Sequence, residues 1–158
     1  MTDMQIIDTD MGGKTIMRRL KKLDDAQGFV GVFFDTDTYE NGATVAQVAA
    51  WNEYGTEDIP SRPFMRQSFD ENRKNLEQIL EENFGDLLDG KILPSSVLNK
   101  AGKELKAKMK KKIVDFKTPP NAPSTIRKKG FDNPLIHTKK LLRSIEFKKA
   151  TDINKTGI

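Results

Sequence analysis

Residues 51–66, WNEYGTEDIPSRPFMR, join the end of one predicted helix to the start of the next. Gly55 stands where a glycine commonly ends a helix. Pro63 suits a first helical turn, because its missing N–H would be unpaired there anyway. A short acidic loop with Pro60 lies between them. The stretch therefore predicts a stiff helix–loop–helix corner with no catalytic-looking group.

The chain before this corner predicts a strand and two helices. Residues 29–34, FVGVFF, form a compact β-rich run and predict a buried strand. Thr44, with Gln47 three residues later, is a capping-box pattern that starts a helix over residues 45–54. A shorter amphipathic helix is predicted over residues 14–23.

Two long amphipathic helices are predicted after the corner. The first begins near residues 61–63 and ends at Gly85 or Gly90. Its apolar arc contains Met65, Phe69, Leu76, Ile79, Leu80 and Leu87. The second begins at residues 94–96 and is stopped by the prolines at 119–120. Its narrow apolar stripe contains Leu98, Ala101, Leu105, Met109, Ile113 and Phe116.

Shorter elements are predicted in the C-terminal part. Ser124 as N-cap and Gly130 as stop bound one short helix, and Thr138 as N-cap begins another. An alternating strand is expected around Ile145 and Phe147.

The sum of these elements predicts an α+β fold, a small, mostly antiparallel sheet packed with about three to four helices. Residues 14–150 are expected to form a single domain. Residues 1–13 would be a flexible N-terminal segment and residues 151–158 a C-terminal tail.

Composition excludes several classes of protein. A length of 158 residues suits one domain, and the absence of cysteine excludes a disulfide framework and thiolate metal sites. No apolar run approaches the roughly 18 residues that a membrane-spanning helix requires. The N-terminus lacks the basic start and apolar stretch of a signal peptide. We expect a soluble, intracellularly made protein, without a membrane partner or a cofactor.

The net charge of +4 conceals an uneven distribution along the chain. Residues 70–89 contain seven acidic and two basic side chains, whereas residues 98–117 contain eight lysines and two acidic side chains. Residues 124–150 contain eight basic and two acidic side chains. This asymmetry indicates charged faces that meet each other, a neighbouring subunit or nucleic acid.

The basic face of the second long helix has two interpretations, which both stay open. Its outward lysines are Lys100, Lys103, Lys110 and Lys111. They would bind phosphates by counterion release, or they would be solvated and pair with the acidic helix of the same or a neighbouring chain. Few nearby aromatics for base stacking and no recognisable nucleic-acid motif favour the second interpretation.

Patterns typical of nucleotide and metal sites are incomplete. Residues 13–15, GKT, resemble the end of a phosphate-binding loop, but the position five residues before the glycine holds the carboxylate of Asp8. The acidic turn 35–41 places Glu40 where a calcium loop requires glycine. His137 is the only histidine, which gives little support to a zinc site or a Ser-His triad. We expect neither an enzyme nor a small-molecule substrate.

The corner resembles a motif of small tailed-bacteriophage proteins, the tail-completion or neck proteins of the Mu-like virion morphogenesis and lambda-like minor tail groups. That motif has Asn or His, an acidic residue or Gln, an aromatic, Gly, a short loop and Ile-Pro-Ala-Arg-Pro-Phe. The matching residues are Asn52, Glu53, Tyr54, Gly55, Thr56, Ile59, Pro60, Ser61, Arg62, Pro63, Phe64, Met65 and Arg66.

A second segment resembles the Pro-Leu-Ile-Asp-Thr-Gly-x-Leu-x-x-Ser-Ile pattern of the same family. The matching residues are Pro134, Leu135, Ile136, Thr138, Leu141, Ser144 and Ile145. His137 replaces the usual acid and Lys139 the usual glycine. The resemblance spans about residues 14–150.

The resemblance implies a structural virion protein. Family members form rings, commonly of six copies, at the head–tail junction or the tail end, where they complete or terminate the tail tube and join it to the connector. The implied partners are further copies, connector, neck and tail-tube proteins, and packaged DNA in passing. The implied location is the tail or neck of the virion. The alternative is a basic nucleic-acid-binding module that uses the lysines of residues 98–117.

For the corner itself we expect the aromatics Trp51, Tyr54 and Phe64 to pack together. We expect Arg62 and Arg66, four residues apart on one helix side, to bind carboxylates of the same or the next subunit. The candidate loop-anchor or subunit-interface residues are Trp51, Glu53, Tyr54, Gly55, Ile59, Pro60, Arg62, Pro63, Phe64 and Arg66.

Overall fold

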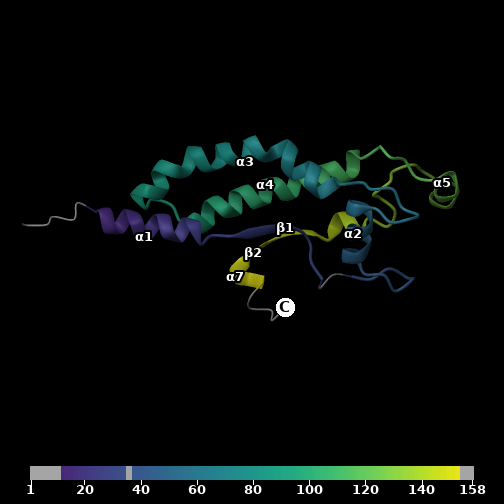
Figure 1. Cartoon of the computed structure of the whole chain (residues 1–158), viewed down its shortest axis with the longest axis horizontal. Helices are drawn as coiled ribbons and strands as arrows, with labels where there is room; N and C mark the ends of the chain where they lie inside the picture. Colours follow the sequence, from purple (N-terminus) through teal and green to yellow (C-terminus); the bar gives the residue numbers. More distant parts are fainter. Residues whose placement is uncertain (1–11, 35–36, 154–158) are drawn as a thin grey trace, which may run out of the picture.

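The computed structural model of the chain describes residues 12–34 and 37–153 (Figure 1). These residues form an α+β fold, as the sequence predicted, with a two-stranded antiparallel sheet. The elements in chain order are α1 (Gly13–Asp24), β1 (Gly28–Val32), α2 (Val45–Tyr54), α3 (Phe64–Asp89), α4 (Pro94–Asp115), α5 (Pro123–Lys129), α6 (Lys140–Arg143), β2 (Ile145–Lys149) and α7 (Ala150–Ile153). The helices of these residues outnumber the three to four predicted for the fold as a whole. The two short helices predicted before the last strand form α5 and α6, and α7, which was not predicted, stands at the start of the predicted C-terminal tail.

The long helices α3 and α4 lie side by side along the longest axis of the molecule (Figure 1). Gly90, at φ 73°, ends α3 in the left-handed conformation that glycine adopts without strain. Gly85 lies inside the helix, so of the two predicted stops only Gly90 is used. Pro94 occupies the first turn of α4, where no intrahelical donor is lost.

The sheet packs on α4 through one aromatic ring. In the register of the two strands Val30 pairs with Phe147 and Val32 with Ile145. A Cβ placed on Gly102 of α4 would lie 2.3 Å from the Phe147 ring. Gly102 therefore allows the strand to approach the helix more closely than any residue with a side chain would.

The strand predicted over residues 29–34 forms as β1, but the prediction that it is buried was wrong for most of its length. β1 ends at Val32, and Phe29 and Phe34 are 49% and 80% exposed. The reason is the size of the sheet. Two strands packed on helices through one face leave the other face open.

The main core lies where α2, α3, α4 and the C-terminal segment meet. Its buried members are Val45, Ala49, Phe64, Met109, Ile113, Phe116, Leu135, Leu141 and Ile145. A smaller cluster of Ile79, Leu87 and Val97 joins α3 to α4 at the other end. The predicted apolar arc of α3 is thus only partly buried, since Phe69 and Leu80 remain exposed.

The N-terminal helix α1 matches its prediction and packs on the end of α3. Arg19 donates a hydrogen bond to the carbonyl oxygen of Leu88, one of the last carbonyls of α3. Such carbonyls lack intrahelical partners, so a cation there both caps the helix and opposes its dipole.

Two predicted N-caps were wrong by one or two positions. Ala122 precedes α5, because Pro123 takes the first helical position and places Ser124 inside the helix. Lys139 precedes α6, although the Thr138 hydroxyl still accepts a bond from the Lys140 N–H at 3.4 Å. Within the ranges described, no helix is long and apolar enough to cross a membrane.

Candidate functional site

The corner at residues 51–66 begins with a helix held at both ends. At its start, the Thr44 hydroxyl accepts the Gln47 N–H at 3.1 Å, and the Gln47 side chain accepts the Thr44 N–H at 2.9 Å. At its end Gly55 adopts φ 81°. A Cβ on Gly55 would lie 3.0 Å from the backbone nitrogen of Ser61. The predicted capping box and stop are both confirmed, and the glycine is required for close passage of the returning loop.

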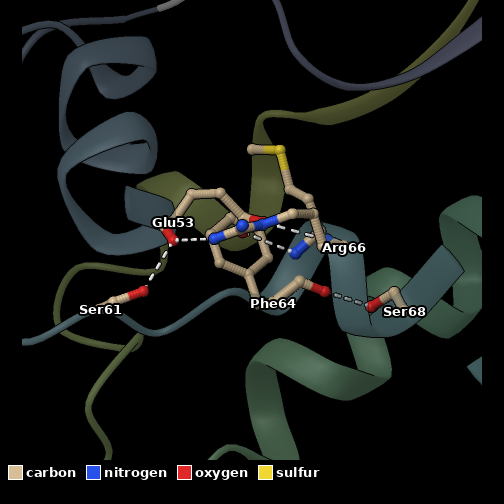
Figure 2. Close-up of polar contacts among 6 residues, drawn as sticks. Glu53, Ser61, Phe64, Arg66 and Ser68 are labelled. Carbon is tan, nitrogen blue, oxygen red and sulfur yellow. Dashed lines mark hydrogen bonds and ion pairs between the residues drawn. The ribbon is translucent and has the colours of Figure 1, made fainter. Parts of the chain in front are cut away.

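The loop that follows is closed by hydrogen bonds rather than by its prolines alone. The Thr56 N–H donates to the Ile59 carbonyl at 2.8 Å, and the Thr56 hydroxyl accepts the Ile59 N–H at 3.0 Å. The Ser61 hydroxyl donates to the backbone carbonyl of Glu53 at 3.0 Å (Figure 2). Pro63 is the residue before the first turn of α3. The loop is therefore braced at its tip and at its base.

Glu53 is the centre of the corner and is only 3% exposed. Its carboxylate accepts the backbone N–H groups of Met65 and Arg66 at 2.8 and 3.0 Å. These groups belong to the first turn of α3, where N–H groups lack intrahelical partners and the helix dipole favours negative charge. A side chain at the end of α2 thus caps α3.

Arg66 binds the same glutamate through its guanidinium group (Figure 2). Its Nε lies 3.0 Å from Oε1 of Glu53, and its Nη2 lies 2.9 Å from the Glu53 carbonyl oxygen. Its guanidinium carbon lies 5.2 Å from the centre of the Tyr54 ring, a cation–π distance. The carboxylate that Arg66 was expected to bind is therefore in its own chain.

Arg62 is buried and binds carbonyl groups instead of a carboxylate. Its Nε and Nη2 donate to the carbonyls of Pro119 and Pro120 at 3.0 and 2.8 Å, and its Nη1 donates to Asn52 at 3.2 Å. The expectation that Arg62 and Arg66 share one helix side was wrong, because α3 begins at Phe64 and leaves Arg62 in the loop. Burial lowers the pKa of Arg62, and nearby Asp132 partly offsets this shift.

Asp132 fixes the segment that Arg62 holds. Its Oδ1 accepts both the backbone N–H and the side-chain N–H of Asn121, each at 3.1 Å. Asn121 is buried and directly follows the two prolines bound by Arg62. Neither Asn121 nor Asp132 was predicted from the sequence. Nothing in the local pattern indicates a contact between residues that come together only after the chain has folded.

The three aromatics of the corner do not pack together as expected. Phe64 is fully buried, whereas Trp51 is 39% and Tyr54 72% exposed. The burial of Glu53 explains this difference. The side of α2 that faces α3 is occupied by the carboxylate, so the aromatic side chains on the helix lie toward solvent.

The two segments that carry the phage-protein resemblance meet in this region. Phe64 from the corner belongs to the same core cluster as Leu135, Leu141 and Ile145 from the second segment. Lys139, which stands at the family's glycine position, adopts φ 62°. That is the left-handed region that glycine favours and that other residues adopt only rarely.

The lysine face of α4 is partly paired with acids of the same chain. Lys112 and Lys106 lie 2.5 Å from Glu71 of α3 and Glu146 of β2, and Lys111 pairs with Asp115. Lys100 and Lys103 are exposed, and Lys110 is half-buried. The pair that joins the basic helix to the acidic helix is made by Lys112, which is not one of the four predicted outward lysines, and of those four Lys111 pairs within its own helix.

The incomplete sequence patterns for a nucleotide site and a metal site are not completed by neighbouring residues in the described part of the structure. Residues 13–15 form the first turn of α1, and Asp8 lies outside the described residues, as does part of the turn 35–41. His137 is exposed. Across residues 12–34 and 37–153, no group of three or more His, Asp or Glu side chains is placed to hold a metal ion.

Comparisons with known proteins identify no relative. No family model matches the chain, and searches of curated proteins and of solved structures found no match.

Proposed function

We propose that the protein is a structural component of a tailed-phage virion. It would assemble as a ring, in six copies as the resemblance implies, that completes or terminates the tail tube at the head–tail junction or the tail end. The observation that carries this proposal is the contact between the two resembling segments. Phe64 of the corner packs with Leu135, Leu141 and Ile145, 71 or more residues away along the chain.

The construction of the corner suits a docking element. Glu53 and Arg62 tie α2, α3 and the 119–121 segment together through buried hydrogen bonds. Because the backbone is already held, binding a neighbour through this surface would cost little ordering entropy. The surface presents Tyr54 with the Arg66 guanidinium over its ring, and Trp51 on the same helix is also exposed. Aromatic and arginine side chains are enriched in protein interfaces.

Imaging tests this proposal directly. Negative-stain images and mass photometry of the purified protein, recorded from dilute to the highest reachable concentration, should show closed rings of uniform size with a central lumen. A protein that remains monomeric throughout, or that forms open chains without closure, would overturn self-assembly into a ring.

The nucleic-acid alternative is tested on the same sample. A gel-shift series across salt, with the native protein and a Lys100→Glu/Lys103→Glu variant, should show no difference between the two. Binding at low salt that disappears in the variant, together with an absence of rings, would favour the alternative.

A further inference from the structure

An apolar groove runs between α3 and α4 beside the end of α1. Its volume is about 620 Å³, and Leu80, Phe84 and Leu98 lie in its walls. A second hollow of about 500 Å³ shares Leu76, Leu98 and Ala101 with it and continues toward β1. The two hollows together form one elongated apolar surface.

This surface is open to solvent along α3. Phe69, Leu80 and Phe84 are each 44–47% exposed. Glu81 is the one charged residue that lines the larger hollow among the described residues. A small polar ligand would need several convergent polar groups for orientation. The lining instead fits the apolar side chains of a protein segment.

Helix α1 shows what kind of segment fits. Its C-terminal half already lies against the groove, since Leu23 lines it and Arg19 binds the end of α3. Its N-terminal half extends past the end of the α3–α4 pair (Figure 1). There Ile16 and Met17 are 40% and 66% exposed. The described residues therefore leave an apolar groove unfilled and, on a projecting helix, apolar side chains uncovered.

Charge favours α1 of another copy as the occupant. The N-terminal half of α1, residues 13–18, contains two basic residues and no acidic one, whereas α3 contains seven acidic and three basic residues. Residues 1–11 of the same chain contain three acidic residues and no basic one, so their charge would oppose α3.

We propose that the N-terminal half of α1 from one copy docks into the α3–α4 groove of the next copy, with Ile16 and Met17 against Leu80 and Phe84. The contact uses two different surfaces on each copy. Head-to-tail contacts of this kind close into rings when the rotation between copies allows it. The inference rests on the proposed self-assembly and names the surfaces that would mediate it.

Single-cysteine cross-linking tests the contact, because the native chain contains no cysteine. A Met17→Cys chain and a Phe84→Cys chain are prepared separately, mixed and mildly oxidised. We expect a disulfide-linked heterodimer in the mixture and much less dimer in either chain alone. The control mixture pairs Met17→Cys with Phe131→Cys, an exposed phenylalanine that follows α5 at the opposite end of the molecule (Figure 1). It should cross-link no more than background.

A second variant keeps the test independent of oxidation chemistry. Met17→Asp removes an exposed apolar side chain and should lower the mean assembled mass at a given concentration while circular dichroism stays native. An unchanged mass distribution would contradict the inference.

The outcomes separate this inference from the proposed function. Rings that form without the Met17–Phe84 cross-link would overturn the inference and leave the ring proposal standing. The cross-link without closed rings would support the contact and contradict the ring. Two further outcomes would overturn the inference. A dominant Met17→Cys homodimer would mean that α1 pairs with α1 of another copy. An intrachain disulfide in an Ile6→Cys/Phe84→Cys chain would mean that the chain's own N-terminal segment occupies the groove.

Discussion

The guanidinium of Arg66 donates two hydrogen bonds to Glu53, with Nε 3.0 Å from the carboxylate and Nη2 2.9 Å from the backbone carbonyl of the same residue. The same carboxylate caps the first turn of α3. One buried glutamate thus sets the angle between α2 and α3, and with it the shape of the corner proposed to meet a neighbour.

Replacing this carboxylate should destabilise the whole domain. Glu53→Gln keeps the size of the side chain but places an NH2 group where the first turn of α3 needs an acceptor. We expect a loss of about 2–4 kcal/mol in the free energy of unfolding, measured by urea denaturation. Glu57→Gln in the exposed loop is the matched control and should change stability by less than about 0.5 kcal/mol. Equal effects of the two substitutions would contradict the role of Glu53.

The two prolines after α4 should lose their anchor when Arg62 is shortened. Arg62→Lys retains the charge but cannot reach Pro119, Pro120 and Asn52 together. We expect a loss of about 2–3 kcal/mol, with faster amide hydrogen exchange concentrated at Asn121. Arg127→Lys, at an exposed position of α5, serves as control. If amide exchange at Asn121 is the same in the Arg62→Lys and Arg127→Lys variants, Arg62 does not anchor the segment that contains the two prolines.

Two glycines inside long helices should respond with opposite signs to alanine. At Gly85 a new Cβ meets open space, so Gly85→Ala should stabilise the protein by about 0.5–1 kcal/mol through helix propensity. At Gly102 the new Cβ collides with Phe147, so Gly102→Ala should destabilise it by about 1–3 kcal/mol. Thermal unfolding of both variants is the measurement. Adding Phe147→Leu to Gly102→Ala should recover part of the lost stability. A Gly102→Ala variant that is more stable than the native protein would contradict the close packing of α4 against Phe147.

A glycine at position 139 should increase the stability of the folded protein. Lys139 holds φ 62°, a conformation that costs a non-glycine residue about 1–2 kcal/mol. Glycine removes this cost but enlarges the unfolded ensemble, so Lys139→Gly should stabilise by about 0.5–1 kcal/mol. Lys128→Gly, in the helical backbone of α5, should destabilise by about 1 kcal/mol. Chemical denaturation that ranks the two variants the other way would contradict the backbone geometry.

The pairing of Asp37 with Lys140 predicts a pH dependence. A hydrogen bond from Lys140, with a 3.2 Å ion pair, and a bond from the Thr38 N–H lower the pKa of Asp37 below its usual 3.8. Since the folded-state pKa is the lower one, the pair stabilises the native state above about pH 3.8. This contribution is lost as the pH falls through the folded-state value.

Carbon-detected NMR titration of the Asp37 carboxyl measures this effect. In Lys140→Met the pKa of Asp37 should rise toward 3.8, with a residual lowering from Thr38. Lys149→Met removes a lysine from β2 and should leave the Asp37 titration unchanged. An identical Asp37 titration in native protein and Lys140→Met would contradict the pairing.

The local elements of the fold follow closely from the sequence. Several helix ends lie where the sequence predicted them: Thr44 with Gln47 begins α2, and Gly55, Gly90 and Gly130 end α2, α3 and α5. For α3 the sequence had offered two stops, of which Gly90 is used. These signals are predictable because caps and left-handed glycines act on backbone groups a few residues away. The class of the fold follows from the same signals, since the order of helices and strands limits how they pack.

The candidate site was predictable in its members but not in its contacts. The corner residues were identified from the pattern at residues 51–66, yet Trp51 and Tyr54 lie toward solvent and Arg62 binds backbone carbonyls. Backbone carbonyls carry no residue identity, so no sequence pattern indicates that Pro119 and Pro120 are the partners of Arg62.

By itself the sequence located α1 to α6 and the two strands, because their start and stop signals are local. It missed α7, and α4 ends at Asp115, four residues before the proline predicted to stop it. Only the tertiary structure decided that Glu53 caps α3, that Gly102 accommodates Phe147, and that the apolar arc of α3 stays half open between α1 and β1. These outcomes depend on which surfaces meet after the chain has collapsed. With two strands and a short α1, residues 12–34 and 37–153 do not cover both sides of the long helices.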